Sequence, residues 1–127
     1  GAKRCVPLPV SAPFHCALMA PAAERLRQDL VRLRFADARP AVVTNVEAAP
    51  NSQAARIPAL LTEQVTAPVR FTEMVEQLCA LGVSHFLEVG PGRVLSGLLA
   101  RIDRRSQRAN FGVWQELAAA REFITAS

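Results

Sequence analysis

Apolar residues return every three or four positions between residues 16 and 35, with charged residues between them. The apolar positions are Leu18, Ala22, Leu26, Leu30 and Leu33. This spacing places them on one face and predicts an amphipathic helix. Residues 41–46 (AVVTNV) are instead rich in β-branched side chains and follow Pro40, which predicts a buried strand.

Helix and strand patterns continue to alternate along the rest of the chain. Pro58 fits the first turn of a helix that runs to about residue 65, and Gly82 is placed to end another helix over residues 71–81. The other predicted segments are a short strand at 5–11, a loop at 11–15, a turn at 48–52, a strand at 83–89, a tight turn at 90–92, a helix at 93–102, a strand at 109–113 and a helix at 115–124. Such alternation predicts an α/β fold with helices on both faces of a sheet.

Length and composition narrow the class of protein. With 127 residues, half of them apolar, the chain is long enough for one domain with its own core. Its net charge of +4 favours an acidic partner, which could be a nucleic acid, an acidic protein or a phosphorylated small molecule.

The cysteines and the hydropathy pattern limit the environment. Cys5, Cys16 and Cys79 are odd in number and share no metal-ligand spacing, so we expect neither a disulfide framework nor a metal site, and a reducing, cytoplasmic location fits best. No apolar run approaches the roughly 20 residues of a membrane-spanning helix. We therefore expect a protein without a membrane partner.

His15 is the candidate for acid–base chemistry. It lies in a proline-containing loop between a predicted strand and a predicted helix, where an imidazole can face a cleft and act as a general base. The alternative is a histidine that only packs near the helix start. Cys16 is adjacent, but neighbouring side chains at a helix start point in different directions, which argues against a Cys–His pair.

The nucleophile that such a base would activate is not recognisable. The strand-to-helix turn G-x-S-x-G is absent, and Ser96, inside a predicted helix, is expected to fill space. Either the nucleophile lies on upstream sequence or this chain is not a complete enzyme. The segment Gly90-Pro91-Gly92 is not followed by the third glycine of a dinucleotide fingerprint, because Leu95 stands there, so we interpret it as a tight turn.

Three segments together resemble one enzyme family. Residues 10–19 (VSAPFHCALM), 62–71 (TEQVTAPVRF) and 86–98 (FLEVGPGRVLSGL) are similar, in order and spacing, to successive signatures of bacterial malonyl-CoA:acyl carrier protein transacylases, members of the acyltransferase family. The resemblance extends over nearly the whole chain and identifies residues 1–127 as the C-terminal portion of such an acyltransferase domain.

The resemblance implies a function and roles for four residues. His15 falls on the catalytic histidine that activates a serine, here expected upstream, and Gln64 falls on the residue whose carbonyl orients that histidine. Phe14 falls on a position typical of malonyl-selective members, and Val94 on a position that lines the acyl pocket. The full enzyme is then expected to transfer malonyl from coenzyme A to acyl carrier protein, by a ping-pong mechanism, in fatty acid biosynthesis. The coenzyme A thioester is a substrate here, and no cofactor is expected.

The resemblance also implies what this chain lacks. The family has an α/β-hydrolase-like three-layer subdomain and a ferredoxin-like one, and the chain would supply only the later half of the former. We expect exposed apolar surface, a fragment that is unstable, self-associates or needs the N-terminal half of the enzyme as a partner, and no activity of the isolated chain.

The basic segment 101–108 (RIDRRSQR) supports two further readings. It could steer the acidic carrier protein, or it could be a solvated helix end whose arginines meet the helix dipole. A catalytically incomplete interaction domain that binds an acidic partner is therefore the alternative function. Nucleic acid is disfavoured because there is no zinc-finger spacing or RNP-like aromatic strand and aromatics that could stack on bases are few. His85 is expected to be structural.

Overall fold

The computed structural model describes residue 1, residues 5–7 and residues 12–126, in two compact units. Unit 1 comprises residues 1–46 and 50–69, and unit 2 comprises residues 47–49 and 70–127. None of the helices in the described parts of the chain is long and apolar enough to span a bilayer.

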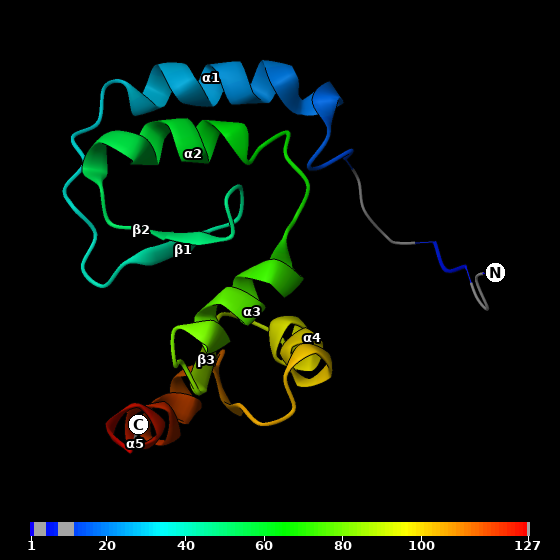
Figure 1. The fold of residues 1–127 in the computed structure, drawn as a ribbon, viewed down its shortest axis with the longest axis vertical. Coiled ribbons are helices and arrows are strands. Elements are labelled where there is room, and N and C mark those ends of the chain that lie inside the picture. Colours follow the sequence, from blue (N-terminus) through cyan, green and yellow to red (C-terminus); the bar gives the residue numbers. More distant parts are fainter. Residues whose placement is uncertain (2–4, 8–11, 127) are drawn as a thin grey trace. The chain divides into compact units, whose positions relative to one another are not determined.

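Unit 1 is built around two helices that lie side by side (Figure 1). Helix α1 (Ala20–Leu30) follows a 3₁₀ turn, η1 (Ala17–Met19), and helix α2 (Ile57–Glu63) follows the 3₁₀ turn η2 (Ala54–Arg56). Both helices carry proline in the first turn, where the missing N–H would have no intrahelical partner. Their contact buries Leu30 and Leu60.

The predicted helix over 16–35 is correct at its centre and too long at both ends. Leu18 is 75% exposed and Leu33 is 59% exposed, because the first lies in η1 and the second lies beyond the last turn of α1. Ala23 is buried in place of the predicted Ala22. Ala23 and Leu30 are seven residues apart, two helical turns, and therefore share the face that contacts α2.

A short hairpin links these helices. Strand β1 (Val42–Thr44) pairs with β2 (Ala49–Asn51). The strand predicted over 41–46 is therefore shorter and not buried, since Val42 is 55% exposed, and the turn predicted over 48–52 lies earlier, at 45–48. Ala48 has a φ of 50°, in the left-handed region, which lets the chain reverse before β2.

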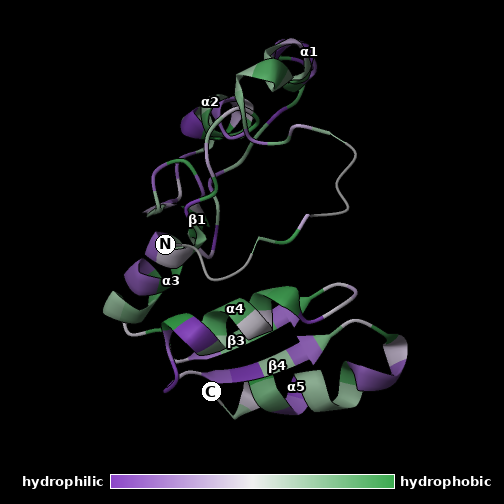
Figure 2. Cartoon of the chain, turned by 90° about the vertical axis from the view of Figure 1, so that its right-hand side faces the viewer, coloured by the Kyte–Doolittle hydropathy of each residue, from purple (hydrophilic) through white to green (hydrophobic). Residues whose placement is uncertain are grey.

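Unit 2 contains a parallel pair of strands with a helix on each face. Its elements are α3 (Phe71–Ala80), β3 (His85–Val89), α4 (Val94–Ile102), β4 (Gln107–Phe111), the 3₁₀ turn η3 (Trp114–Glu116) and α5 (Leu117–Thr125). Strands β3 and β4 pair from His85↔Gln107 to Val89↔Phe111. Parallel pairing needs a crossover, which α4 supplies, and α4 and α5 lie on opposite faces of the pair (Figure 2).

Gly82 and Gly112 in unit 2 show two different reasons for a glycine, a backbone conformation and a close neighbour. Gly82 ends α3 with a φ of 88°, as predicted from its position. A Cβ at Gly112 would lie 2.8 Å from the carbonyl oxygen of Gly90, closer than real Cβ contacts, so the chain after β4 can pass the Gly90 turn only without a side chain. Strand β4 ends just before this approach, two residues earlier than predicted.

The predicted α/β class is confirmed, because the described residues form helices and two two-stranded sheets. Of the strand predicted over 5–11, residues 5–7 have no regular structure and residues 8–11 lie outside the described residues. The assignment to a hydrolase-like three-layer core and to a single C-terminal domain portion stays a prediction.

Candidate active site

His15 lies in the loop immediately before η1, as the sequence predicted. Its φ is 57°, in the left-handed region that non-glycine residues seldom adopt, although histidine does so more often than most. The side chain is exposed and reaches the segment that follows α2, about 50 residues later in the chain. The loop therefore presents the imidazole at the surface of unit 1 instead of packing it along a helix face.

Two backbone carbonyls fix the protonation of the His15 ring. Nδ1 lies 3.0 Å from the carbonyl oxygen of Gln64 and 3.1 Å from that of Ala67. A carbonyl oxygen can only accept, so Nδ1 must carry the hydrogen in both contacts. In the neutral ring this leaves Nε2 as an unprotonated acceptor, and no described residue forms a hydrogen bond to it. The ring is thus oriented as a base.

The two acceptors belong to a turn that continues α2. The N–H of Gln64 donates to the Leu60 carbonyl at 3.1 Å, and that of Ala67 donates to the Glu63 carbonyl at 3.1 Å. Gln64 is the C-cap of α2, so its own carbonyl has no following helical donor and remains available. The structure therefore brings His15 and Gln64 together through the backbone carbonyl of Gln64 and not through its side chain.

The neighbours of His15 in sequence point elsewhere. Phe14 is 59% exposed, and its N–H donates to the Ala12 carbonyl at 2.9 Å. The thiol of Cys16 donates to the Pro13 carbonyl at 3.0 Å. Sulfur and imidazole thus have separate partners, as expected if Cys16 and His15 do not form a catalytic pair.

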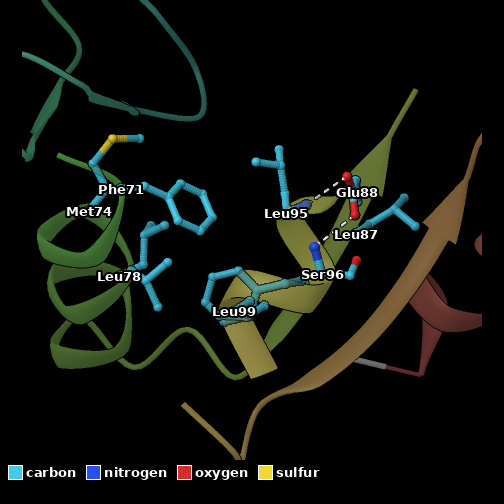
Figure 3. Close-up of a pocket in the computed structure, with 10 residues that line it drawn as sticks. Phe71, Met74, Leu78, Leu87, Glu88, Leu95, Ser96 and Leu99 are labelled. Atoms are coloured by element: carbon cyan, nitrogen blue, oxygen red, sulfur yellow. Dashed lines mark hydrogen bonds between the residues drawn. The ribbon is translucent and has the colours of Figure 1, made fainter. Parts of the chain in front are cut away.

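Val94 lies in unit 2, at the first position of α4, and is 71% exposed. An apolar pocket in this unit has a volume of about 140 Å³ and lies between α3, β3 and α4 (Figure 3). It is lined almost wholly by apolar side chains, namely Phe71, Met74, Val75, Leu78, Phe86, Leu87, Leu95 and Leu99, together with Glu88 and Ser96. Val94 is not among them, although its two following neighbours are.

Glu88 holds the start of α4 against the sheet. Its carboxylate accepts the N–H of Leu95 at 3.0 Å and that of Ser96 at 2.8 Å (Figure 3). The side-chain amide of Asn110 also donates to it, at 3.1 Å. Hydrogen bonds from Ser96, followed by those from Leu95 and Asn110, lower the pKa of Glu88 below the ordinary value of 4.5. The carboxylate caps the positive end of the helix, in the manner of an N-cap.

The Glu88 cap helps to decide whether the Gly90-Pro91-Gly92 segment could bind a phosphate. Two of the N–H groups at the start of α4 that a phosphate would use, those of Leu95 and Ser96, are already bonded to Glu88. The interpretation of this segment as a tight turn, and not as a phosphate loop, agrees with that geometry. Gly90 and Gly92 have φ values of 130° and 94°, both in the region that favours glycine.

The basic segment 101–108 has mixed environments. Arg101 lies in the last turn of α4, and Arg108 donates to the carbonyls of Asp103 at 3.1 Å and Ser106 at 2.8 Å. Arg104 and Arg105 are exposed. Part of the segment therefore completes a helix end, and part of it presents charge to solvent.

The other candidates from the sequence are in structural environments. Ser96 receives a hydrogen bond from Asn110 at 2.9 Å. The His85 ring forms a hydrogen bond with the Ser84 hydroxyl at 2.9 Å, and its centroid lies 5.5 Å from that of Phe123, with the two rings tilted by 58°. Among the residues that the structure describes, no group of three His, Cys, Asp or Glu side chains could hold a metal ion.

Sequence reasoning did not find Ala67 or Glu88. Ala67 acts through its backbone carbonyl, for which its side chain gives no signal. For Glu88 a signal exists, because an acidic residue at the end of a strand, shortly before a helix start, can reach the first N–H groups of that helix.

Comparison with known proteins gives a consistent result. No family model matches the chain. It is 49% identical, over 105 residues, to the malonyl CoA-acyl carrier protein transacylase of Bacillus subtilis, which covers 83% of this chain and 33% of that protein. Among solved structures, acyl-carrier-protein-S-malonyltransferase from Bartonella henselae has a TM-score of 0.88 at 42% identity, over 97% of this chain and 40% of that one.

A further structure contains a type II PKS acyl-carrier protein in complex with its malonyl-transacylase. The chain superposes on it with a TM-score of 0.89 at 43% identity, over 96% of this chain and 40% of that one. The chain thus spans between a third and two fifths of the length of the relatives it matches. The resemblance to malonyl-CoA:acyl carrier protein transacylases that its three motifs indicated is confirmed over most of the chain, in agreement with a C-terminal part.

Proposed function

We propose that this chain, homologous to malonyl-CoA:acyl carrier protein transacylases over most of its length, supplies the catalytic histidine of such an enzyme. The observation that supports the proposal is the contact of His15 Nδ1 with the carbonyl oxygens of Gln64 and Ala67, at 3.0 and 3.1 Å. It leaves Nε2 as the proton acceptor, the arrangement that a histidine needs to act on a hydroxyl nucleophile.

In the proposed reaction His15 moves one proton in each direction. A serine on the remaining part of the enzyme attacks the malonyl thioester carbon while its hydroxyl proton passes to Nε2. The carbon–sulfur bond then breaks, and the proton on Nε2 passes to the departing coenzyme A sulfur. In the second half, the carrier-protein thiol gives its proton to Nε2, attacks the acyl-serine and displaces the serine, which takes the proton back.

Three further assignments belong to this proposal. Phe14, next to the base, favours malonyl over bulkier acyl groups, and Val94 lines the acyl pocket of the assembled enzyme. The exposed arginines Arg104 and Arg105 steer the acidic acyl carrier protein, an effect that salt would weaken. No cofactor enters the reaction, which takes place in the cytoplasm within fatty acid biosynthesis.

The test uses the full-length gene product and its His15→Ala variant. Malonyl transfer from coenzyme A to acyl carrier protein should fall by about 10²–10⁴-fold, the usual contribution of a general acid–base. His85→Ala, which removes the other histidine, is the matched control and should keep near-normal transfer. The isolated 127-residue chain should transfer nothing. Near-normal transfer by His15→Ala would refute the role.

A further inference from the structure

The turn that accepts the His15 ring is held at both of its ends. At its start, backbone N–H groups of Gln64 and Ala67 bond back to α2. At its end stands Pro68, whose carbonyl oxygen accepts the side-chain amide of Asn45 at 2.9 Å. Asn45 is half-buried and belongs to the turn between β1 and β2, 23 residues earlier.

The Asn45 contact lies one residue from a His15 acceptor. Ala67, which accepts Nδ1 at 3.1 Å, immediately precedes Pro68. Proline fixes its φ near −65°, so ψ of Pro68 is the one soft backbone dihedral left between the Pro68 carbonyl and the plane of the Ala67–Pro68 peptide, which contains the Ala67 carbonyl. Because Pro68 also has no N–H, its carbonyl is the only backbone hydrogen-bonding group through which this residue can be held.

We propose that Asn45 is a positioning residue for His15. By holding the Pro68 carbonyl, its amide fixes the direction of the Ala67 carbonyl and so keeps the hydrogen of the imidazole on Nδ1 and Nε2 available as a base. The geometric part of this inference stands on the contacts of unit 1, and its consequence for transfer rests on the proposed function. At metal sites, loss of a group that orients a ligating histidine typically lowers metal affinity or activity by about 10–100-fold, and we expect an effect at the lower end of this range for His15.

The first experiment measures the tautomer of His15 by ¹⁵N NMR in the 127-residue chain. Only His15 and His85 contribute histidine signals, so His85 is an internal reference. In the unaltered chain at a pH where the ring is neutral, the His15 Nε2 signal should be that of an unprotonated ring nitrogen. In Asn45→Asp, which keeps the shape but cannot donate when ionised, it should move toward the average of the two tautomers.

Asn51→Asp is the matched control. Asn51 lies in β2 of the same hairpin, is 4% exposed, and donates to the Gln53 carbonyl at 3.2 Å, away from the acceptor turn. Its substitution should leave the His15 signal unchanged. Equal shifts in both variants would mean general loosening of the hairpin and would overturn the inference. Should Asn45→Asp not fold, Asn45→Ala removes the same donor without adding charge.

The second experiment measures malonyl transfer by the full-length Asn45→Asp variant. Its kcat should fall by about tenfold, with the KM for malonyl-CoA little changed, because the substituted residue acts on the base and not on the substrate. A shifted tautomer with full transfer would keep Asn45 as a positioning residue and refute the role of His15. An unchanged tautomer would overturn the inference at any transfer rate.

Discussion

Polar groups perform different tasks in the two units. In unit 1, the bonds to the His15 ring join segments 49 and 52 residues apart and end on an exposed side chain. In unit 2, the bonds to Glu88 join the start of α4 to β3 and β4. The first arrangement orients one reactive group, and the second attaches a helix to a sheet. Substitutions in unit 1 should therefore affect chemistry, and equivalent ones in unit 2 should affect stability.

The largest effect on stability is expected where unit 2 buries apolar area. Leu99 is 4% exposed and contributes to the pocket between α3, β3 and α4. Leu99→Ala should lower the free energy of unfolding by about 2–5 kcal/mol, through lost burial and the cavity left behind. Denaturant unfolding followed by circular dichroism measures this change.

The matched control for Leu99 is the same substitution in unit 1. Leu18 is 75% exposed, so Leu18→Ala should change the free energy of unfolding by less than about 0.5 kcal/mol. If Leu99→Ala and Leu18→Ala lowered the free energy of unfolding equally, burial would not explain the stability of the chain. The predicted difference between the two positions would then be wrong.

The Glu88 cap should make part of the stability depend on pH. Its pKa is lowered in the folded protein, so its contribution is fully present above 4.5, the ordinary value, and is lost as pH falls through the folded-state pKa. Glu88→Gln should therefore unfold at lower denaturant concentration at pH 7, and its difference from the unaltered chain should close below pH 4.5. A difference that persists at acid pH would contradict this cause.

Glu24→Gln is the corresponding control in unit 1. A hydrogen bond from Arg27, followed by one from Gln28, lowers the pKa of Glu24 to about 2, but both partners of the Glu24–Arg27 pair are more than half exposed. Exposed pairs are screened by salt and stabilise little. The effect of Glu24→Gln should thus be small and vanish at high salt, whereas that of Glu88→Gln should remain.

The smallest effect is expected at Gln64, although it belongs to the candidate site. Its contribution to His15 comes from the backbone carbonyl, which every residue type supplies. Gln64→Ala in the full-length protein should keep the tautomer of His15 and reduce transfer by less than about threefold, a change that a coupled transfer assay resolves. A loss as large as that of His15→Ala would show that the amide side chain itself takes part.

Local patterns predicted most elements of unit 2 well. Helix α3 begins at Phe71 as expected and ends beside Gly82, and α4 begins one residue later than predicted, because apolar periodicity and glycine stops are local signals. In unit 1 the same signals made the strand at β1 and the helix at α1 too long, placed the turn after β1 too late and missed β2. The partner of β1 and the end of α1 depend on packing between segments that are distant in the sequence. The residue pattern of a short segment does not reveal such packing.

By itself, the sequence determined the α/β class, from periodicity within short segments, and the likeness to transacylases, from three motifs in the same order, and it indicated His15 as the candidate base. The role of Gln64 was implied by the resemblance, and the structure adds that its backbone carbonyl lies within hydrogen-bond distance of the ring. Only the tertiary structure decided that Ala67 is a second acceptor, that Asn45 holds the turn that carries it, and that Glu88 caps α4. These contacts use backbone groups, which every residue shares, or join residues far apart in sequence, so their specificity lies in the fold and not in the residue types.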